Sequence, residues 1–409
     1  MKTVFFVSVT AIAMLRSIPA YAADNADTPA DAITNGKATI DTRYRLETVD
    51  QDGFAEGATA QTIRTKLKYT TGNFKGFSAV LEVENVLVLQ NDYNSTINGK
   101  TNFPVIADPK STEINQAYLA YKGESGATVK AGRIGMNMTN QRFVGTVGWR
   151  QDDQTYDSLV VMIEPIDNLM LTGSYVWNVN RIFSDDNPLG NLDTDTTWVS
   201  ADYTGVNFGT LTAYGLFIDL NDAPVFGLSS QTLGLRFAGK TKASDTLSLL
   251  YEAEYATQSD YKDNPVDYSA DYYHLLAGVA SGGFTLKAGY EVLGSHSGNA
   301  AFKTPLATLH KFNGWTDKFL NTPNGGLEDL YASMSYKVQA DGPLKGLKFD
   351  VIYHDFSADV GGDYGSEINL QVAKNINQNY SVALKYGSYN ADGFATDTDK
   401  LWISLGAKF

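Results

Sequence analysis

Charged and apolar residues take strict turns along two neighbouring segments between Ala38 and Tyr69. In the first segment Ile40, Tyr44 and Leu46 occupy even positions, and most residues between them are ionised. Successive residues of a β-strand point to opposite sides of its sheet, so each segment has one apolar and one charged side. Acids and bases packed into adjoining strands predict that the charged side lines a confined aqueous lumen while the apolar side meets lipid.

Composition agrees with a single large barrel. The 409 residues would suffice for two or three soluble domains, but they include 24 Tyr, 20 Phe and 37 Gly against only 11 Pro. Beyond residue 22, no stretch approaches the roughly 20 apolar residues that a membrane-spanning helix needs. A membrane protein with this sequence must therefore be a closed barrel. The absence of cysteine excludes disulfides, thiolate metal sites and a cysteine nucleophile, and the formal charge of −14 argues against a nucleic-acid partner.

The N-terminus has the layout of a secretory signal peptide. Lys2 precedes an apolar run from Val4 to Leu15, and the segment ends in Ala20-Tyr21-Ala22. We therefore predict a signal peptide over residues 1–22, a short periplasmic leader over 23–36 and one barrel over 37–409.

About eighteen alternating segments follow Gly36, each near the roughly 10 residues that a tilted strand needs to cross a membrane. Short and long connections alternate between them, as in an up-and-down antiparallel barrel with periplasmic turns and extracellular loops. The predicted fold class is an all-β transmembrane barrel of about 18 strands in the bacterial outer membrane. Its C-terminal Phe409 resembles the signature that the barrel-assembly machinery reads, and lipopolysaccharide and outer-membrane lipids are the expected surroundings.

The charged side of the strands supplies the candidate pore lining. Opposite charges across neighbouring strands either act on passing ions or form ion pairs that keep the strands in register. Rings of bases favour anions, so unpaired bases would set the selectivity. With two arginines of a long connection, the predicted pore-lining residues are Asp41, Arg43, Arg45, Glu47, Arg64, Lys66, Glu82, Glu84, Arg142, Arg150, Arg236, Lys287, Lys348 and Asp350.

Several loop segments resemble the alginate-export family of outer-membrane porins. The resemblance implies an eighteen-stranded barrel whose arginine-rich constriction passes an anionic polyuronate. It extends over nearly the whole mature chain and is most specific in the long loop from Gly294 to Leu327. The segments that carry it are Asp92–Thr96, Val105–Pro109, Asn140–Phe143, Val147–Gln151, Thr304–His310 and Phe312–Trp315.

Arg142 and Arg150 lie in the connection from Met136 to Gln154, which the resemblance implies folds into the barrel. A guanidinium matches the planar fork of a carboxylate, so such a loop would narrow the pore and favour carboxylate-bearing solutes. The alternative is a solvated extracellular loop or one that anchors lipopolysaccharide phosphates. Trp149 and Trp315 could stack on sugars or pack the loops themselves.

Catalytic signals are thin. Of the four histidines, His310 is expected to hydrogen-bond within its loop, and His354 cannot form a dyad with Asp355 because strand neighbours point to opposite sides. The acidic segments 185–187 and 193–195 lack the spacing of an EF-hand, although they could hold surface Ca²⁺ weakly. We predict no catalytic residue, no metal site and no cofactor.

The sequence thus predicts a monomeric, passive channel for anionic or sugar-acid solutes, extending to export of an alginate-like polyuronate. A general uptake porin for small polar nutrients is the alternative within transport. An outer-membrane barrel enzyme and a sealed structural barrel are the rivals from other classes.

Overall fold

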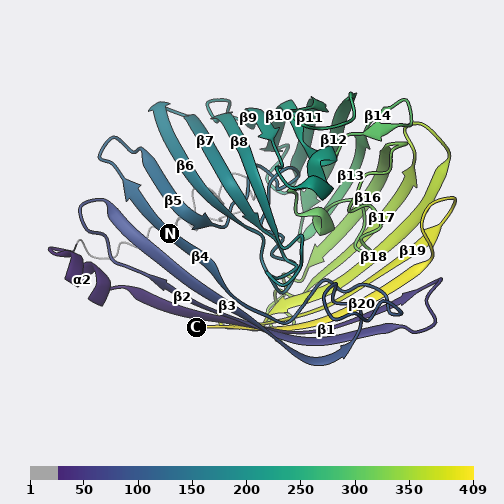
Figure 1. Cartoon of the computed structure of the whole chain (residues 1–409), viewed down its shortest axis with the longest axis horizontal. Helices are drawn as coiled ribbons and strands as arrows, with labels where there is room; N and C mark the ends of the chain where they lie inside the picture. The colour runs from purple at the N-terminus through teal and green to yellow at the C-terminus, as the bar shows by residue number, and fades with distance from the viewer. Residues whose placement is uncertain (1–25) are drawn as a thin grey trace.

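The computed structural model describes residues 26–409, and the predicted signal peptide lies outside this range. Eighteen antiparallel strands form one sheet, which closes where β1 pairs with β20 from Asp41 opposite Lys408 to Gln51 opposite Thr398 (Figure 1). The predicted fold class is confirmed. The strands are β1 (Lys37–Gln51), β2 (Ala58–Thr70), β3 (Phe77–Asp92), β4 (Ser111–Lys122), β5 (Thr128–Ile134), β6 (Thr155–Ile166), β7 (Leu169–Asn180), β8 (Asn191–Tyr203), β9 (Thr210–Ile218), β10 (Ser230–Lys242), β11 (Ser248–Asp260), β12 (Ser269–Ser281), β13 (Phe284–Leu293), β16 (Leu327–Lys337), β17 (Lys348–Ser357), β18 (Asp363–Asn375), β19 (Tyr380–Ala391) and β20 (Thr398–Lys408).

The remaining elements are small and lie between strands or before the barrel. Helix α2 (Pro29–Thr34) stands in the predicted leader, where Thr28 and Asp31 form a reciprocal capping box at its start. Two 3₁₀ turns, η1 (Ala223–Leu228) and η2 (Leu309–Lys311), and the hairpin of β14 (Ser295–His296) with β15 (Ala300–Ala301) belong to long connections. No helix of the described residues has the length and apolarity required to cross a membrane.

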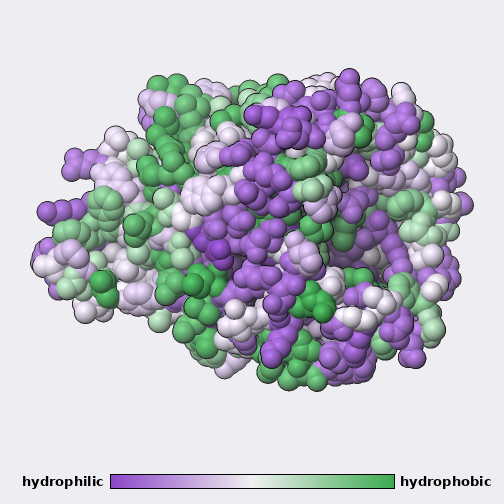
Figure 2. Space-filling view, in the orientation of Figure 1, coloured by the Kyte–Doolittle hydropathy of each residue, from purple (hydrophilic) through white to green (hydrophobic). Residues whose placement is uncertain are grey.

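Apolar side chains on alternate positions cover the outside of the barrel. On β2 and β3, Leu67 and Leu81 are 56% and 49% exposed, while Glu82, the residue after Leu81, is buried. Figure 2 shows hydrophilic residues across the middle of the view, where loops fill the ring of strands, and groups of hydrophobic residues nearer its edges. In lipid this outer layer is the favourable surface, and closure of the sheet leaves no unpaired edge.

Connection lengths differ between the two ends of the barrel. The turn between β12 and β13 needs only Gly282 and Gly283, both at positive φ, which suits a two-residue hairpin. The longest connections, 93–110, 135–154 and 294–326, all lie at the opposite end, which faces outside the cell in outer-membrane barrels.

Segments of these three loops run inward instead of remaining outside. Val144 of the second loop forms a parallel bridge with Leu306 of the third, and Thr308 N donates to Gln141 O at 3.1 Å. Asp108 of the first loop is fully buried and accepts a hydrogen bond from Gln151 N at 2.8 Å. In Figure 1 such coil segments lie within the ring of strands. The three loops therefore form one body that narrows the barrel.

Strand β6 departs from the alternating pattern, because it is apolar on both sides. Tyr156, Val160 and Met162 face inward and are buried in a cluster that includes Met136 and Phe143 from the inward loop. Both sides of this strand are apolar because one faces lipid and the other faces loop residues rather than water. The interior is therefore not lined by ionised groups alone.

Candidate functional site

The predicted strand residues of the pore lining share the inward side of the sheet. Arg45, Glu47, Arg64, Glu82, Glu84, Arg236 and Asp350 are buried, Asp41, Arg43, Lys66 and Lys287 are half-buried, and Lys348 is exposed. Most of them have partners of opposite charge. Ion pairs join Arg64 to Asp41, Lys66 to Glu84 at 2.9 Å, Arg236 to Glu252 at 2.7 Å, Lys348 to Asp350 at 2.7 Å and Lys68 to Glu82 at 3.8 Å. The ion-paired wall is thus the arrangement that most of these charges adopt.

Arg150 is the centre of one charged cluster. Its guanidinium lies 3.1 Å from Glu47 on β1 and 3.0 Å from Asp317 in the third loop. It also lies 3.9 Å from Asp108 in the first loop, which in turn is 3.7 Å from Arg45. Burial alone would lower the pKa of Arg150, but these carboxylates outweigh burial and raise it. Arg150 remains charged and holds three loops to the wall.

Asp317 extends this cluster to β19 and β20. It accepts from Lys400 Nζ at 3.0 Å and bonds to His310 Nδ1 at 2.7 Å. Burial acts to raise the pKa of Asp317, but the charge of Lys400, the hydrogen bond to His310 and the charge of Arg150 outweigh it and hold that pKa well below its ordinary value. Burial lowers the pKa of His310 well below its usual range, so the imidazole is neutral. His310 thus bonds within its loop, as the sequence predicts, and also reaches Lys385 at 3.0 Å.

Trp149 and Trp315 pack the loops against this cluster. Trp149 stacks on His310 with ring centroids 4.2 Å apart, and the Arg45 guanidinium lies 4.1 Å from the Trp149 centroid. The Lys385 ammonium lies 3.7 Å from the centroids of both tryptophans. These cation–π contacts occupy the ring faces. Trp149 and Trp315 therefore pack the loops, rather than offering a surface for sugars to stack on.

Arg142 is the centre of a second cluster, on the other side of the interior. Its guanidinium donates to Glu291 at 2.8 Å, to Thr304 at 3.2 Å and to Asn313 at 3.1 Å. The side chain is 1% exposed. Asn313 in turn donates to Asp329 on β16 at 3.0 Å. Protein acceptors therefore saturate Arg142, whose geometry is that of a clamp between loops and wall rather than of a base open to solutes.

Arg43 differs from these arginines. In the part of the chain that the structure describes, no carboxylate lies within ion-pair distance of it. It donates to Gln151 Oε1 at 2.8 Å, to the carbonyl of Gly148 at 3.0 Å and to that of Arg150. A cavity of about 330 Å³ opens beside it, at the end of the barrel that carries the short turns. The lining of this cavity includes Asp41, Arg43, Arg64, Ser381, Gly406 and Lys408.

A carboxyl pair fixes the end of the second loop. Burial, a hydrogen bond with Glu84 and the charge of Glu84 raise the pKa of Asp152 well above its ordinary value. The neighbouring Asp153 pairs with Lys66. Burial tends to raise the pKa of Asp153, but Lys66 and Arg64 outweigh it and lower that pKa.

Acids on β11 to β18 form an inner surface that the sequence-based prediction did not single out. Glu252, Glu254, Glu291, Asp329 and Glu367 are inward and mostly buried. His354 bonds to Asp329 at 2.9 Å, which agrees with the prediction that it forms no dyad with Asp355. The spacing of Glu252 and Glu254, two positions apart on one strand, is the signal that could have identified part of this surface.

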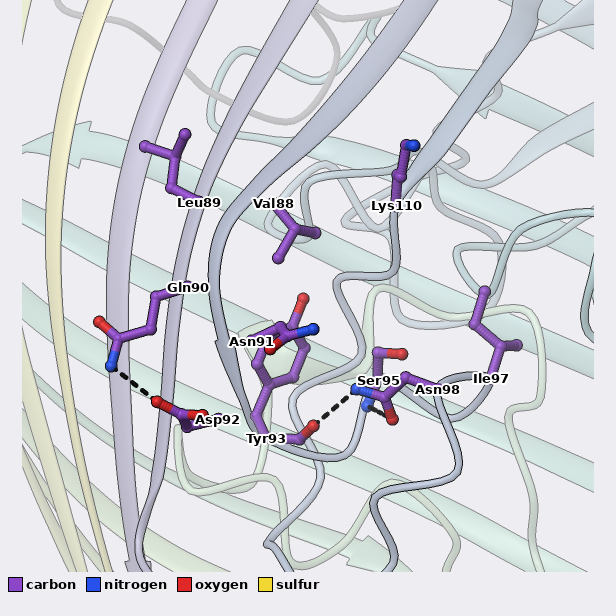
Figure 3. A pocket seen from close by; sticks show the side chains of 10 residues that line it. All are labelled: Val88, Leu89, Gln90, Asn91, Asp92, Tyr93, Ser95, Ile97, Asn98 and Lys110. Atoms are coloured by element: carbon purple, nitrogen blue, oxygen red, sulfur yellow. Dashed lines mark hydrogen bonds between the residues drawn. The ribbon is translucent and has the colours of Figure 1, made fainter.

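A larger cavity of about 650 Å³ lies at the outer end of β3 and the loop that follows it (Figure 3). Its lining joins Leu89, Gln90 and Asp92 from the strand to Ile97 and Lys110 from the loop. Tyr93, at its floor, donates to the carbonyl of Asp108 at 2.7 Å. The cavity is therefore linked to the Arg150 cluster through the loop backbone, although the charges of that cluster do not line it.

No protein-family model and no curated protein sequence matches the chain. Solved structures do match in fold. Pseudomonas aeruginosa OpdO aligns with a TM-score of 0.70 at 14% identity over 93% of this chain and 98% of its own. Acinetobacter baumannii OccAB3 gives 0.70 at 16% identity over 92% and 100%, and P. aeruginosa OccD3 (OpdP) gives 0.69 at 16% over 97% of each chain.

These similar structures are Occ and Opd porins of the OprD family, and the likeness is one of fold. The predicted resemblance to the alginate-export family is wrong. The resemblance implied eighteen strands, and the similar structures are also 18-strand barrels, so the strand count does not separate the two kinds of barrel. The loop segments that suggested the resemblance are used here for packing, as Arg142 with Asn313 and Trp149 with His310 show. The predicted outer-membrane location agrees with the shared fold.

Proposed function

We propose that this barrel is an outer-membrane channel for the uptake of small polar solutes, with a preference for those that carry a carboxylate. The observation that carries the proposal is the row of bases on β19, β20, β1 and β2, together with the narrowing by three inward loops. Along this arc the inward bases include Arg43, Arg45, Arg64, Lys66, Lys68, Lys385 and Lys400.

Charge balance within the arc supports an anion preference. Much of the neutralising charge comes from loop carboxylates, Asp108, Asp153 and Asp317, which lie on one side of the bases. Arg43 contacts carbonyl and amide oxygens instead. No carboxylate of the described residues lies within ion-pair distance of its positive charge, which acts at the cavity near the periplasmic end and attracts solute carboxylates there.

Narrowing by the loops favours small solutes over a polymer. The second and third loops are joined by backbone hydrogen bonds, such as Gly145 N to Leu306 O at 2.9 Å, and clamped to the wall by Arg142 and Arg150. A passive channel of this form needs no cofactor. We further propose that it acts as a monomer, surrounded by lipopolysaccharide, and that the barrel-assembly machinery recognises Phe409.

Swelling of proteoliposomes tests the proposal. Purified barrel is reconstituted, and swelling rates are compared for a neutral monosaccharide, a monocarboxylate of similar size and an oligouronate. We expect entry of the two small solutes, with the carboxylate faster, and exclusion of the oligomer. Absence of swelling with every solute would identify a sealed structural barrel, and equal entry of oligouronate would contradict the narrowing.

A further inference from the structure

We propose that Glu252, Glu254 and His274 form a binding site for a divalent cation of the Zn²⁺ type on the inner wall. The first two lie on β11, and His274 lies on β12 directly opposite Glu254. One ligand atom from each residue lies within 4.8 Å of the other two. Ligands of tetrahedral zinc stand at about 2.0–2.2 Å from the metal, so modest side-chain rotation would bring these atoms into range.

Two potential ligand atoms lack hydrogen-bond partners although they are buried. Glu254 is 4% exposed and His274 is 7% exposed, yet Glu254 Oε2 and His274 Nδ1 have no hydrogen bond. Arg236 Nε lies 3.6 Å from the first atom, and Glu252 Oε1 lies 3.4 Å from the second. Buried polar atoms nearly always have a hydrogen bond, so two such atoms without one in a single cluster point to a ligand that the protein itself does not supply.

The other polar atom of each of these two side chains already has a hydrogen bond. Tyr214 donates to Glu254 Oε1 at 2.7 Å, and His274 Nε2 bonds to the Tyr331 hydroxyl at 3.0 Å. An imidazole whose Nε2–H bonds to the tyrosine oxygen presents its Nδ1 lone pair toward the carboxylates, with Glu252 Oε1 3.4 Å away. Such supporting bonds set the tautomer and orientation of metal-binding histidines.

Arg236 is the competitor for this site. Its guanidinium lies 2.7 Å from Glu252 and 3.6 Å from Glu254. One guanidinium opposite two carboxylates leaves a negative charge that a divalent ion can satisfy. One imidazole with two carboxylates suits zinc, whereas Mg²⁺ and Ca²⁺ prefer oxygen ligands alone.

The position of Glu252 connects the site to the second loop. Its side chain keeps 14% exposure, which leaves room for water as a further ligand. Asn140 of that loop donates to Glu252 Oε1 at 3.2 Å. A cation bound to the same carboxylate would compete with this hydrogen bond and so change the position of the loop.

Titration calorimetry with ZnCl₂ on the full barrel in detergent tests the proposal, after heat-modified gel migration has shown each variant to be folded. We expect one site, with His274→Ala and Glu254→Gln each weakening Zn²⁺ binding by at least about tenfold. Arg236→Gln removes the competing cation and should tighten binding by about tenfold. MgCl₂ should give no comparable heat.

His354→Gln is the matched control, because His354 is equally buried on the inner wall but bonds to Asp329. Its Zn²⁺ affinity should be unchanged. Unchanged affinity in both His274→Ala and Glu254→Gln, or no Zn²⁺ binding even in Arg236→Gln, would overturn the proposal. Neither result bears on solute uptake, which is measured separately by swelling.

Discussion

Two arcs of the inner wall have the same alternating backbone pattern but opposite contents. Strands β6 to β9 present buried apolar residues, among them Val160, Val176, Leu192 and Tyr214. Strands β19, β20, β1 and β2 present ionised residues, among them Arg45. On the first arc the loops are held by apolar burial, which has no directional requirement. On the second arc the loops are clamped by ion pairs, which require a defined geometry. We infer that the water-filled path runs beside the charged arc.

The largest effect is expected from Phe143→Ala, which removes the loop anchor on the apolar arc. Phe143 is 1% exposed and contacts Tyr214, Tyr272 and Phe302 with ring centroids 5.2–6.0 Å apart. Truncation of such a side chain costs about 3–5 kcal/mol. Trypsin should then cleave after Arg142 or Arg150, both buried in the native chain, and salt should not change this outcome.

Phe208→Ala is the control, because Phe208 is an aromatic residue that is 53% exposed outside the barrel. Intact protection in Phe143→Ala would show that apolar burial does not seat the loop.

Arg150→Met should have a somewhat smaller effect on the charged arc. It leaves Glu47, Asp108 and Asp317 without their shared cation, and loss of one partner of a buried pair costs about 3–5 kcal/mol, reduced here by access to water. Single-channel recordings should show larger and noisier conductance. Because screening weakens charge repulsion, the change should diminish at high ionic strength.

The double variant Arg150→Met with Glu47→Gln tests the cause of that effect. Removal of one repelling carboxylate should restore part of the native conductance. Identical recordings from Arg150→Met and the native barrel would mean that the ion pairs do not position the loops.

Arg43→Glu should change selectivity more than structure. Arg43 contacts neutral oxygens beside the periplasmic cavity, so reversal of its charge should move the reversal potential in a KCl gradient toward cations. Lys345→Glu is the control, since this exposed lysine pairs with Asp341 on a turn outside the wall. An equal shift in both variants would mean that the inner arc has no special part in selectivity.

The smallest effect is expected from Asp152→Asn, visible only in the pH dependence of loop protection. Burial and Glu84 raise the pKa of Asp152 well above its ordinary value. The stabilisation from the protonated form is therefore present at low pH and lost as pH rises through the folded-state pKa. Native loop protection against trypsin should fall with rising pH, whereas Asp152→Asn should flatten that profile. A profile unaffected by the substitution would exclude the carboxyl pair as its source.

Local periodicity predicted the barrel, because alternation on β1, β2 and β3 reports which side of a strand meets lipid. It also placed charges such as Arg45 and Glu84 on the inner side. It could not predict which loop residues they pair with. Arg142 meets Glu291, 149 residues away, and Arg150 meets Asp317, 167 residues away. Such contacts depend on where loops dock, and nothing local to Phe143 specifies that. Because local sequence does not specify how loops dock, the loop segments also suggested the wrong family.

The reversal potential of the native barrel in a planar bilayer under a KCl gradient tests the central claim most directly. A path beside the basic arc, where no carboxylate of residues 26–409 lies within ion-pair distance of Arg43, predicts an open channel that prefers Cl⁻ over K⁺. A cation preference, or a barrel that conducts no current, would contradict it.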